Sequence, residues 1–258
     1  AVSDCGVCIV GKTQQLAHPK TANHKVNRPL QLCYGDLMGP FTPVAIGGYK
    51  YVSKITDEYT KWTAVYLLTT KDQALQSLQL FAGSTVIPFG GHIVRWRTDK
   101  GGEYTGDEFR QYWLETGIIQ EFAATTTPQQ IGVFERVGRT LSAMVRCMLA
   151  DSSFPSSMWG KLFMTAVYLK NRIPHKALKI ETPFKMLHGE EADLLHLRVI
   201  GARTFMHIEY SSKLEVAALE GKVCGYSEKS KFYRVWNPKN RRVVESRNVT
   251  FIETPPHL

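Results

Sequence analysis

The order of the strand-like runs between residues 30 and 68 constrains the fold of this chain more than any other feature. The runs Leu30–Asp36, Tyr49–Thr56 and Thr63–Leu68 are apolar or alternate between apolar and polar residues, a pattern typical of half-buried strands. Gly39-Pro40, Gly47-Gly48 and the polar segment 57–61 separate the runs, and such residues mark turns. The sequence therefore predicts an antiparallel meander of three strands.

Helical and strand-like segments alternate after the meander. Apolar residues recur with helical spacing in 71–89, 107–116, 133–149 and 155–172, and short apolar runs at 93–97 and 118–122 predict two more strands. This order favours an α/β or mixed α+β layer architecture. The runs 203–208, 222–226, 232–237 and 241–251 are short, aromatic and β-branched, which predicts a small, basic β-rich module with a barrel-like form.

Three carboxylates occupy positions that suit metal ligands. Asp36 closes the first strand-like run, Asp99 directly follows the run at 93–97, and Glu135 lies near the start of the long helical pattern. Hard oxygen ligands suit Mg²⁺ or Mn²⁺, and two such ions about 3.5–4 Å apart can clamp an in-line displacement at phosphorus. A turn or cap role is the simpler alternative for any one of them. Spacing alone leaves other acidic residues open, namely Asp57, Glu103 and Asp107.

The charge of the chain points to a polyanionic partner. The formal net charge is +9 and the sequence pI is about 9.3, which favours nucleic acid, although a solvated basic surface is the alternative. Arg139 and Arg146 follow Glu135 at offsets that return to nearly the same helix face, so one stripe suits both metal and phosphate contact. Arg136 lies off that stripe and Lys100 follows Asp99, and we expect both to contact nucleic acid.

The first 28 residues are polar and carry Cys5 and Cys8 in a Cys-x-x-Cys arrangement. Because zinc takes four ligands, His18 and His24 could complete a site, or the pair is half of a longer motif, or simply two reduced thiols. The five cysteines are an odd number, which favours a reducing compartment. No run approaches the ~18 apolar residues of a membrane span, so we expect no membrane partner. The chain begins without methionine, as a fragment of a longer protein would.

The three candidate acids lie in the segments Asp36-Leu37-Met38-Gly39-Pro40, Asp99-Lys100-Gly101-Gly102-Glu103-Tyr104 and Thr127-Pro128-Gln129-Gln130-Ile131-Gly132-Val133-Phe134-Glu135-Arg136. Together these segments resemble the catalytic blocks of retrotransposon integrases, most closely of the copia type. The downstream segment of that family is similar to Asn171-Arg172-Ile173-Pro174 and His196-Leu197-Arg198-Val199-Ile200-Gly201, and its terminal module to Ser246-Arg247-Asn248-Val249-Thr250-Phe251. Cys5-Gly6-Val7-Cys8 resembles the second half of its zinc module.

The resemblance implies a ribonuclease-H-like fold, with a five-stranded mixed sheet flanked by helices and a C-terminal SH3-like module. It implies a metal-dependent DNA integrase that trims element ends and joins their 3′-hydroxyls to target DNA, with Asp36, Asp99 and Glu135 holding two Mg²⁺ or Mn²⁺ ions. Zinc in the intact protein, homo-oligomers, and a nuclear location preceded by cytoplasmic particles are further implications. We expect a zinc-module remnant at 1–28, a catalytic core at 29–175, a linker at 176–199 and the β-rich module at 200–258.

The chain departs from the family pattern around the third acid. Ile131 stands where asparagine is usual, Phe134 where a small residue is usual, and Gly138 lies inside the predicted helix, where glycine costs about 1 kcal/mol relative to alanine. Two alternatives to strand transfer follow. One is a DNA-binding or assembly module of the same fold without chemistry, and the other is a nuclease that hydrolyses without joining.

Overall fold

The computed structural model describes residues 26–99, 101–122, 128–207, 218–227 and 232–253, with the side chains of 103 and 128–134 excepted. The first sheet contains β1 (Leu32–Met38), β2 (Tyr51–Asp57), β3 (Thr63–Leu68), β4 (Arg95–Thr98) and β5 (Ile119–Phe122) in the order β3-β2-β1-β4-β5. β1, β2 and β3 pair antiparallel, which confirms the predicted meander. β4 pairs parallel with β1 and with β5, so the sheet is mixed, as expected.

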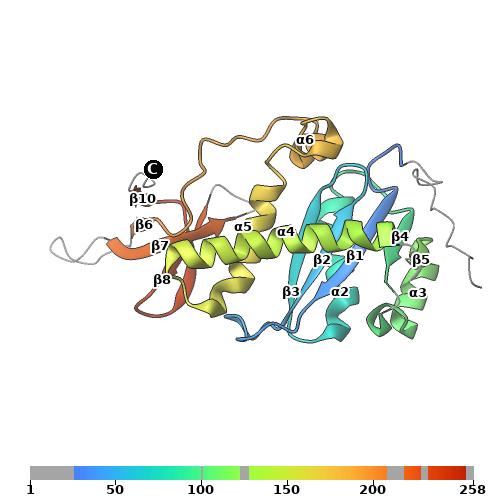
Figure 1. Cartoon of the computed structure of the whole chain (residues 1–258), viewed down its shortest axis with the longest axis horizontal. Coiled ribbons are helices and arrows are strands. Elements are labelled where there is room, and N and C mark those ends of the chain that lie inside the picture. The colour runs from blue at the N-terminus through green and yellow to red at the C-terminus, as the bar shows by residue number, and fades with distance from the viewer. Residues whose placement is uncertain (1–25, 100, 123–127, 208–217, 228–231, 254–258) are drawn as a thin grey trace, which may run out of the picture.

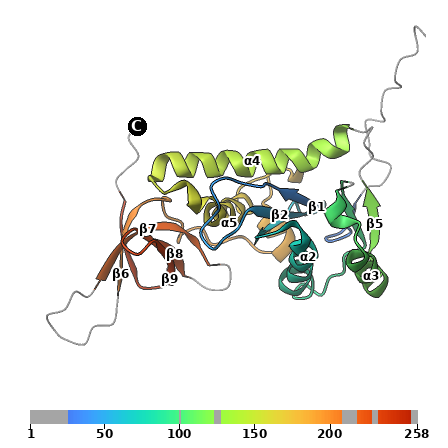
Figure 2. The same ribbon diagram turned by 90° about the horizontal axis from the view of Figure 1, so that it is seen from below.

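Helices cover both faces of this sheet (Figures 1 and 2). On one face, α2 (Ala74–Phe81) and α3 (Asp107–Thr116) bury Phe81 and Trp113 against Trp96 of β4. On the other face, α4 (Pro128–Ser152) and α5 (Trp159–Lys170) bury apolar side chains against β2 and β3. α4 has helical apolar periodicity, with Leu141 and Val145 on its buried face, and it lies across β1 and β2 (Figure 1).

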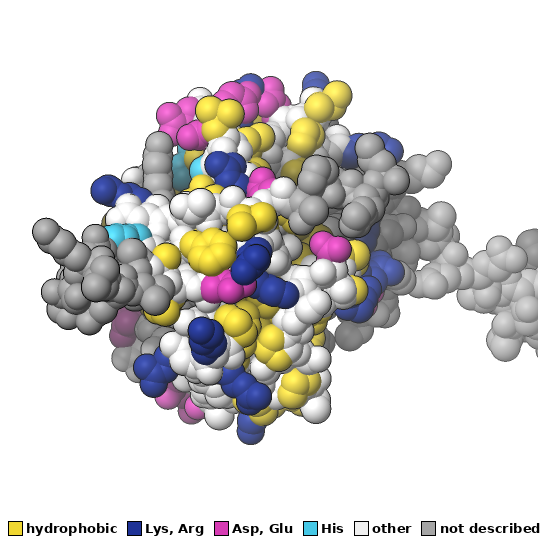
Figure 3. All heavy atoms as spheres, turned by 90° about the vertical axis from the view of Figure 1, so that its left-hand side faces the viewer, with side chains coloured by type: hydrophobic (Ala, Val, Ile, Leu, Met, Phe, Trp, Pro, Cys, Tyr) yellow, Lys and Arg dark blue, Asp and Glu magenta, His cyan; other side chains and the backbone are white. Residues whose placement is uncertain are grey.

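The second sheet is formed by the C-terminal part of the chain and is entirely antiparallel. It contains β6 (Arg203–His207), β7 (Ala218–Tyr226), β8 (Tyr233–Asn237), β9 (Arg242–Ser246) and β10 (Val249–Ile252) in the order β10-β6-β7-β8-β9. A separate antiparallel module of this kind agrees with the expected SH3-like unit. Figure 3 views this end of the molecule, where basic side chains are interleaved with acidic and hydrophobic ones.

The two sheets are joined through a common hydrophobic core. Leu162 and Phe163 of α5 belong to the same buried cluster as Cys224 and Trp236 of the second sheet. Thr165 Oγ1 donates a hydrogen bond of 2.6 Å to the Cys224 carbonyl oxygen. α4 runs from the first sheet to the second (Figure 1). The C-terminal module is therefore packed against the core rather than tethered to it.

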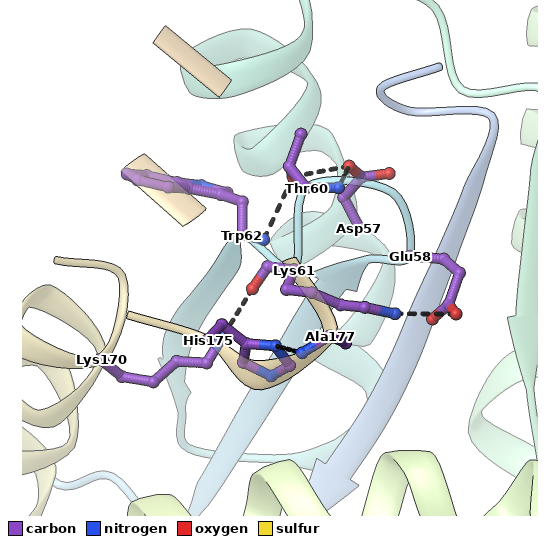
Figure 4. Close-up of polar contacts among 8 residues, drawn as sticks. All are labelled: Asp57, Glu58, Thr60, Lys61, Trp62, Lys170, His175 and Ala177. Carbon is purple, nitrogen blue, oxygen red and sulfur yellow. Dashed lines mark hydrogen bonds and ion pairs between the residues drawn. The ribbon is translucent and has the colours of Figure 1, made fainter. Parts of the chain in front are cut away.

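The C-terminus of α5 fixes the turn between β2 and β3. Lys170 Nζ donates hydrogen bonds to the Lys61 carbonyl oxygen and, at 2.8 Å, to Thr63 Oγ1, and the first of these is drawn in Figure 4. Asn171 Nδ2 donates to the Thr63 carbonyl oxygen at 2.7 Å, and its Oδ1 accepts from the Thr63 amide at 3.0 Å. These bonds satisfy buried polar groups that would otherwise be costly.

Several element boundaries differ from the sequence-based expectation. α4 begins at Pro128, five residues before the predicted start. The predicted helix over 71–89 is a short α2 followed by a π-helical turn at 82–86, and the run 241–251 forms two strands, β9 and β10. The segment 176–199, expected to be a linker, contains α6 (Pro183–His188), and its His196 carbonyl oxygen accepts a hydrogen bond from Tyr233 Oη at 2.9 Å.

Candidate active site

The first candidate acid, Asp36, lies on β1 directly opposite Lys54 of β2. Because cross-strand partners project to the same face of a sheet, both side chains point toward α4. Lys54 Nζ lies 2.7 Å from Asp36 Oδ2, and the Lys54 side chain is 2% exposed while that of Asp36 is 28% exposed. On the opposite face, a Cβ on Gly35 would lie 2.2 Å from the Trp96 ring, so the glycine before Asp36 leaves room for the Trp96 side chain of β4.

The second candidate acid, Asp99, follows β4, the strand that pairs parallel with β1. Tyr34 is paired with Arg97, and Asp36 and Asp99 each lie two residues farther along. Asp99 lies just beyond the end of β4 and is not among the residues that line the pocket described below. The Asp99 side chain is exposed, and its Oδ1 accepts a hydrogen bond from the Gly101 amide at 3.1 Å.

The third acid, Glu135, is presented by α4 to the same pocket as Asp36. This pocket has a volume of about 470 Å³ and is lined by residues of β1 and α4, namely Asp36, Met38, Glu135, Gly138, Arg139, Ser142 and Arg146. The predicted helical stripe is thus confirmed in space, because Glu135, Arg139 and Arg146 share one surface. Arg136 is exposed and is not among the lining residues.

The donors fit a hard divalent cation in kind, since carboxylate oxygens are what Mg²⁺ and Mn²⁺ prefer. Asp36 and Glu135 line one pocket, whereas Asp99 is not among its lining residues. Within the residues that the structure describes, however, no three His, Cys, Asp or Glu side chains are grouped to hold an ion. The complete triad therefore remains a prediction. The charged group in contact with Asp36 among the described residues is the ammonium group of Lys54.

Two of the other acids that spacing left open, Asp57 and Asp107, make different contacts. Asp57 is buried and accepts hydrogen bonds through Oδ1 from the Leu30 amide at 2.9 Å and through Oδ2 from Thr60, as Figure 4 shows for Thr60. Burial raises the pKa of Asp57, and the bonds from Thr60 and Leu30 oppose that rise. Asp107 pairs with Arg110 at an exposed site. Asp57 therefore acts as a turn residue.

Some predicted site residues lie outside the described part of the chain. These are Cys5, Cys8, His18, His24 and Lys100, and the side chain of Glu103 belongs with them. The roles in zinc and nucleic-acid binding expected for these residues therefore remain predictions. No helix among the described residues is long and apolar enough to cross a membrane.

The contact of Lys54 with Asp36 was not identified from the sequence, and neither was a structural reason for a glycine at position 138. A Cβ on Gly138 would lie 3.1 Å from Lys54 Nζ and 3.4 Å from Met38 Sδ, so α4 approaches β1 and β2 closely at this residue. A lysine in the middle of an alternating, largely buried strand was the available signal, because lysine is rarely buried unless it is paired.

Comparison with known proteins is consistent with this geometry. Residues 26–128 match the family model "Integrase core domain" and residues 202–257 match "Retroviral polymerase SH3-like domain". The chain is 36% identical over 255 residues to the Retrovirus-related Pol polyprotein from transposon TNT 1-94 of Nicotiana tabacum, covering 98% of this chain and 19% of that protein. It is 28% identical to the Pol polyprotein from transposon RE2 of Arabidopsis thaliana, covering 96% and 17%.

The solved structures show a similar fold. A simian T-cell lymphotropic virus intasome, determined by cryo-electron microscopy in complex with the PP2A regulatory subunit B56 gamma, aligns with a TM-score of 0.58 at 14% identity. The alignment covers 97% of this chain and 88% of the matched chain. The chain spans only about one fifth of the length of the curated relatives it matches.

Proposed function

Because the chain belongs to the integrase family of retrotransposon Pol polyproteins, we propose that it binds the DNA ends of its element and joins their 3′-hydroxyls to target DNA. The observation that carries this proposal is the pocket between β1 and α4. It combines the carboxylates of Asp36 and Glu135 with the guanidinium groups of Arg139 and Arg146. Carboxylates and guanidiniums on one surface suit cation-dependent chemistry on a phosphate backbone.

We assign Asp36, Asp99 and Glu135 as the residues that would hold Mg²⁺ or Mn²⁺. Bound at these carboxylates, a pair of such ions would stabilise the attacking and leaving oxygens of an in-line displacement at phosphorus. Arg139 and Arg146 would fix the DNA backbone along α4, since guanidinium groups bind phosphate oxygens with two parallel hydrogen bonds. The net charge of +9 supports association with DNA. We also propose, from family membership, that the chain acts as a homo-oligomer in the nucleus.

A strand-transfer assay tests the proposal, with element-end DNA, target DNA and Mg²⁺ or Mn²⁺. We expect joined products from the wild type and their loss in Asp36→Asn, Asp99→Asn and Glu135→Gln. Asp107→Asn is the matched control, because Asp107 is an exposed aspartate paired with Arg110. Undiminished joining by the Asp99 variant would remove that residue from the site. Nicked products without joined ones would indicate a nuclease instead.

The ion pair between Lys54 and Asp36 favours a second candidate function, a DNA-binding or assembly module without chemistry. A buried ammonium already supplies the positive charge that Asp36 needs. This alternative predicts salt-sensitive DNA binding and neither nicked nor joined products at any protein concentration. Detecting Mg²⁺-dependent products that disappear in the Asp36 variant would exclude it.

A further inference from the structure

Lys54 occupies an unusual place for a lysine. It lies in the middle of the central strand pair, directly opposite Asp36, and its side chain is 2% exposed. Lysine is rarely buried to this extent without a paired anion. The 2.7 Å contact between Lys54 Nζ and Asp36 Oδ2 supplies an anionic partner at that position.

Gly138 supplies the space for this ammonium group. A Cβ at this residue of α4 would lie 3.1 Å from Lys54 Nζ, a distance at which one of the two groups must shift. Glycine in a helix interior is unfavourable relative to alanine. The close approach of Lys54 therefore gives a physical reason for a glycine that helix propensity disfavours.

The position of Lys54 matters because its ammonium group contacts Asp36, which we propose as a cation ligand. Asp36 lines the pocket together with Glu135, Arg139 and Arg146. A divalent cation at Asp36 would share the carboxylate with the ammonium group or displace it. Sharing brings like charges together, and displacement breaks the contact between a buried ammonium group and Asp36, so both are unfavourable.

We propose that Lys54 is a resident counter-ion of Asp36 that lowers the affinity of this pocket for divalent cations in the free protein. The inference rests on the proposed function, because only there does Asp36 act as a cation ligand. Removing the ammonium group takes away the positive charge in direct contact with Asp36, while Glu135, Arg139 and Arg146 stay in the pocket, and a cation then binds more tightly.

Direct measurement of Mn²⁺ binding to the DNA-free chain, by titration calorimetry or by the electron paramagnetic resonance signal of unbound Mn²⁺, tests the proposal. We expect Lys54→Met to bind Mn²⁺ at least about tenfold more tightly than the wild type. Lys50→Met is the matched control, because it removes one exposed positive charge from the segment just before β2. It should change the affinity by less than about twofold, since exposed charges are screened.

Two further variants keep the test decisive. The double variant Lys54→Met with Asp36→Asn should lose the increase in Mn²⁺ affinity, which would show that the increase depends on the Asp36 carboxylate. If Lys54→Met does not fold, as judged by circular dichroism, Lys54→Gln is measured instead, because it is neutral and keeps a hydrogen-bond donor. Equal Mn²⁺ affinity in the wild type and the neutral variant would overturn the role of Lys54.

The possible failures are distinguishable. If the wild type binds Mn²⁺ and joins DNA, and the neutral variant binds no more tightly, only the Lys54 proposal fails. If neither protein binds Mn²⁺ at about 10 mM, a concentration beyond the range of weak extracellular cation sites, both the Lys54 proposal and the assignment of this pocket as a cation site fail.

Discussion

Replacing Gly225 with alanine tests whether the C-terminal module is packed rigidly against α5. Gly225 lies on β7, where a Cβ would be 2.2 Å from Thr165 Oγ1. That hydroxyl is not free to turn away at no cost, because it donates to the buried Cys224 carbonyl oxygen at 2.6 Å. The added methyl must push β7 away from α5 or displace the hydroxyl.

The magnitudes follow from these contacts. Overpacking of a close-packed site costs about 1–3 kcal/mol, which we expect for Gly225→Ala. Thr165→Ala leaves the Cys224 carbonyl oxygen without this donor, which costs about 1–3 kcal/mol. In the double variant the hydroxyl that obstructs the new methyl is gone, and the next Thr165 atom, Cβ, lies at 3.5 Å, an ordinary contact distance. The double variant should therefore be more stable than the sum of the single costs implies, by at least about 1 kcal/mol.

Urea unfolding measures these free energies, followed by far-ultraviolet circular dichroism and by tryptophan fluorescence. Gly83→Ala is the matched control, because nothing lies within 4 Å of a Cβ there, and it should change stability by no more than about 1 kcal/mol. Additivity of the two single costs to within about 0.5 kcal/mol would refute the packing argument. So would an unchanged stability in Gly225→Ala alone.

Two further predictions concern charge. Burial, followed by the charges of Lys61 and Lys54, lowers the pKa of Lys170 from 10.5 to about 7. The unfolded chain therefore binds more protons than the folded chain between these values, so the wild type should gain stability relative to Lys170→Met as pH rises above 7; a stability difference independent of pH in urea titrations would contradict this. Arg139→Ala and Arg146→Ala should each weaken DNA binding and reduce the slope of log affinity against log salt concentration by about 1, as measured by fluorescence anisotropy, whereas Arg110→Ala, at an exposed ion pair on α3, should leave the slope unchanged.

The regular elements of the core were predictable because their signals are local. The meander β1–β3 follows from period-two alternation and short turns, and α3 was predicted with its observed bounds. The boundary errors have local causes too. α4 begins at Pro128, within a turn-rich segment whose threonines and proline masked the start, although proline is well suited to the first turn of a helix. α6 begins at Pro183 and has only six residues, too few for a periodic pattern.

The candidate acids could be chosen from the sequence, but their environment could not. Asp36, Asp99 and Glu135 were selected by their settings and by the family resemblance. Asp57 was equally acidic and was separated from them only by its buried hydrogen bonds to Leu30 and Thr60. A turn residue and a cation ligand differ in the groups that surround them in three dimensions, and the sequence around an aspartate does not reveal those groups.

The sequence by itself determined the order and type of the main elements, the basic character of the chain and the identity of the acids, because periodicity, charge and motifs are properties of neighbouring residues. Tertiary structure decided that Lys54 faces Asp36, that Gly138 makes room for it, and that β7 packs against α5. These contacts depend on strand register and on close approach between elements distant in the chain. A shift of one residue in the β1–β2 register would turn Asp36 away from Lys54 to the other face of the sheet.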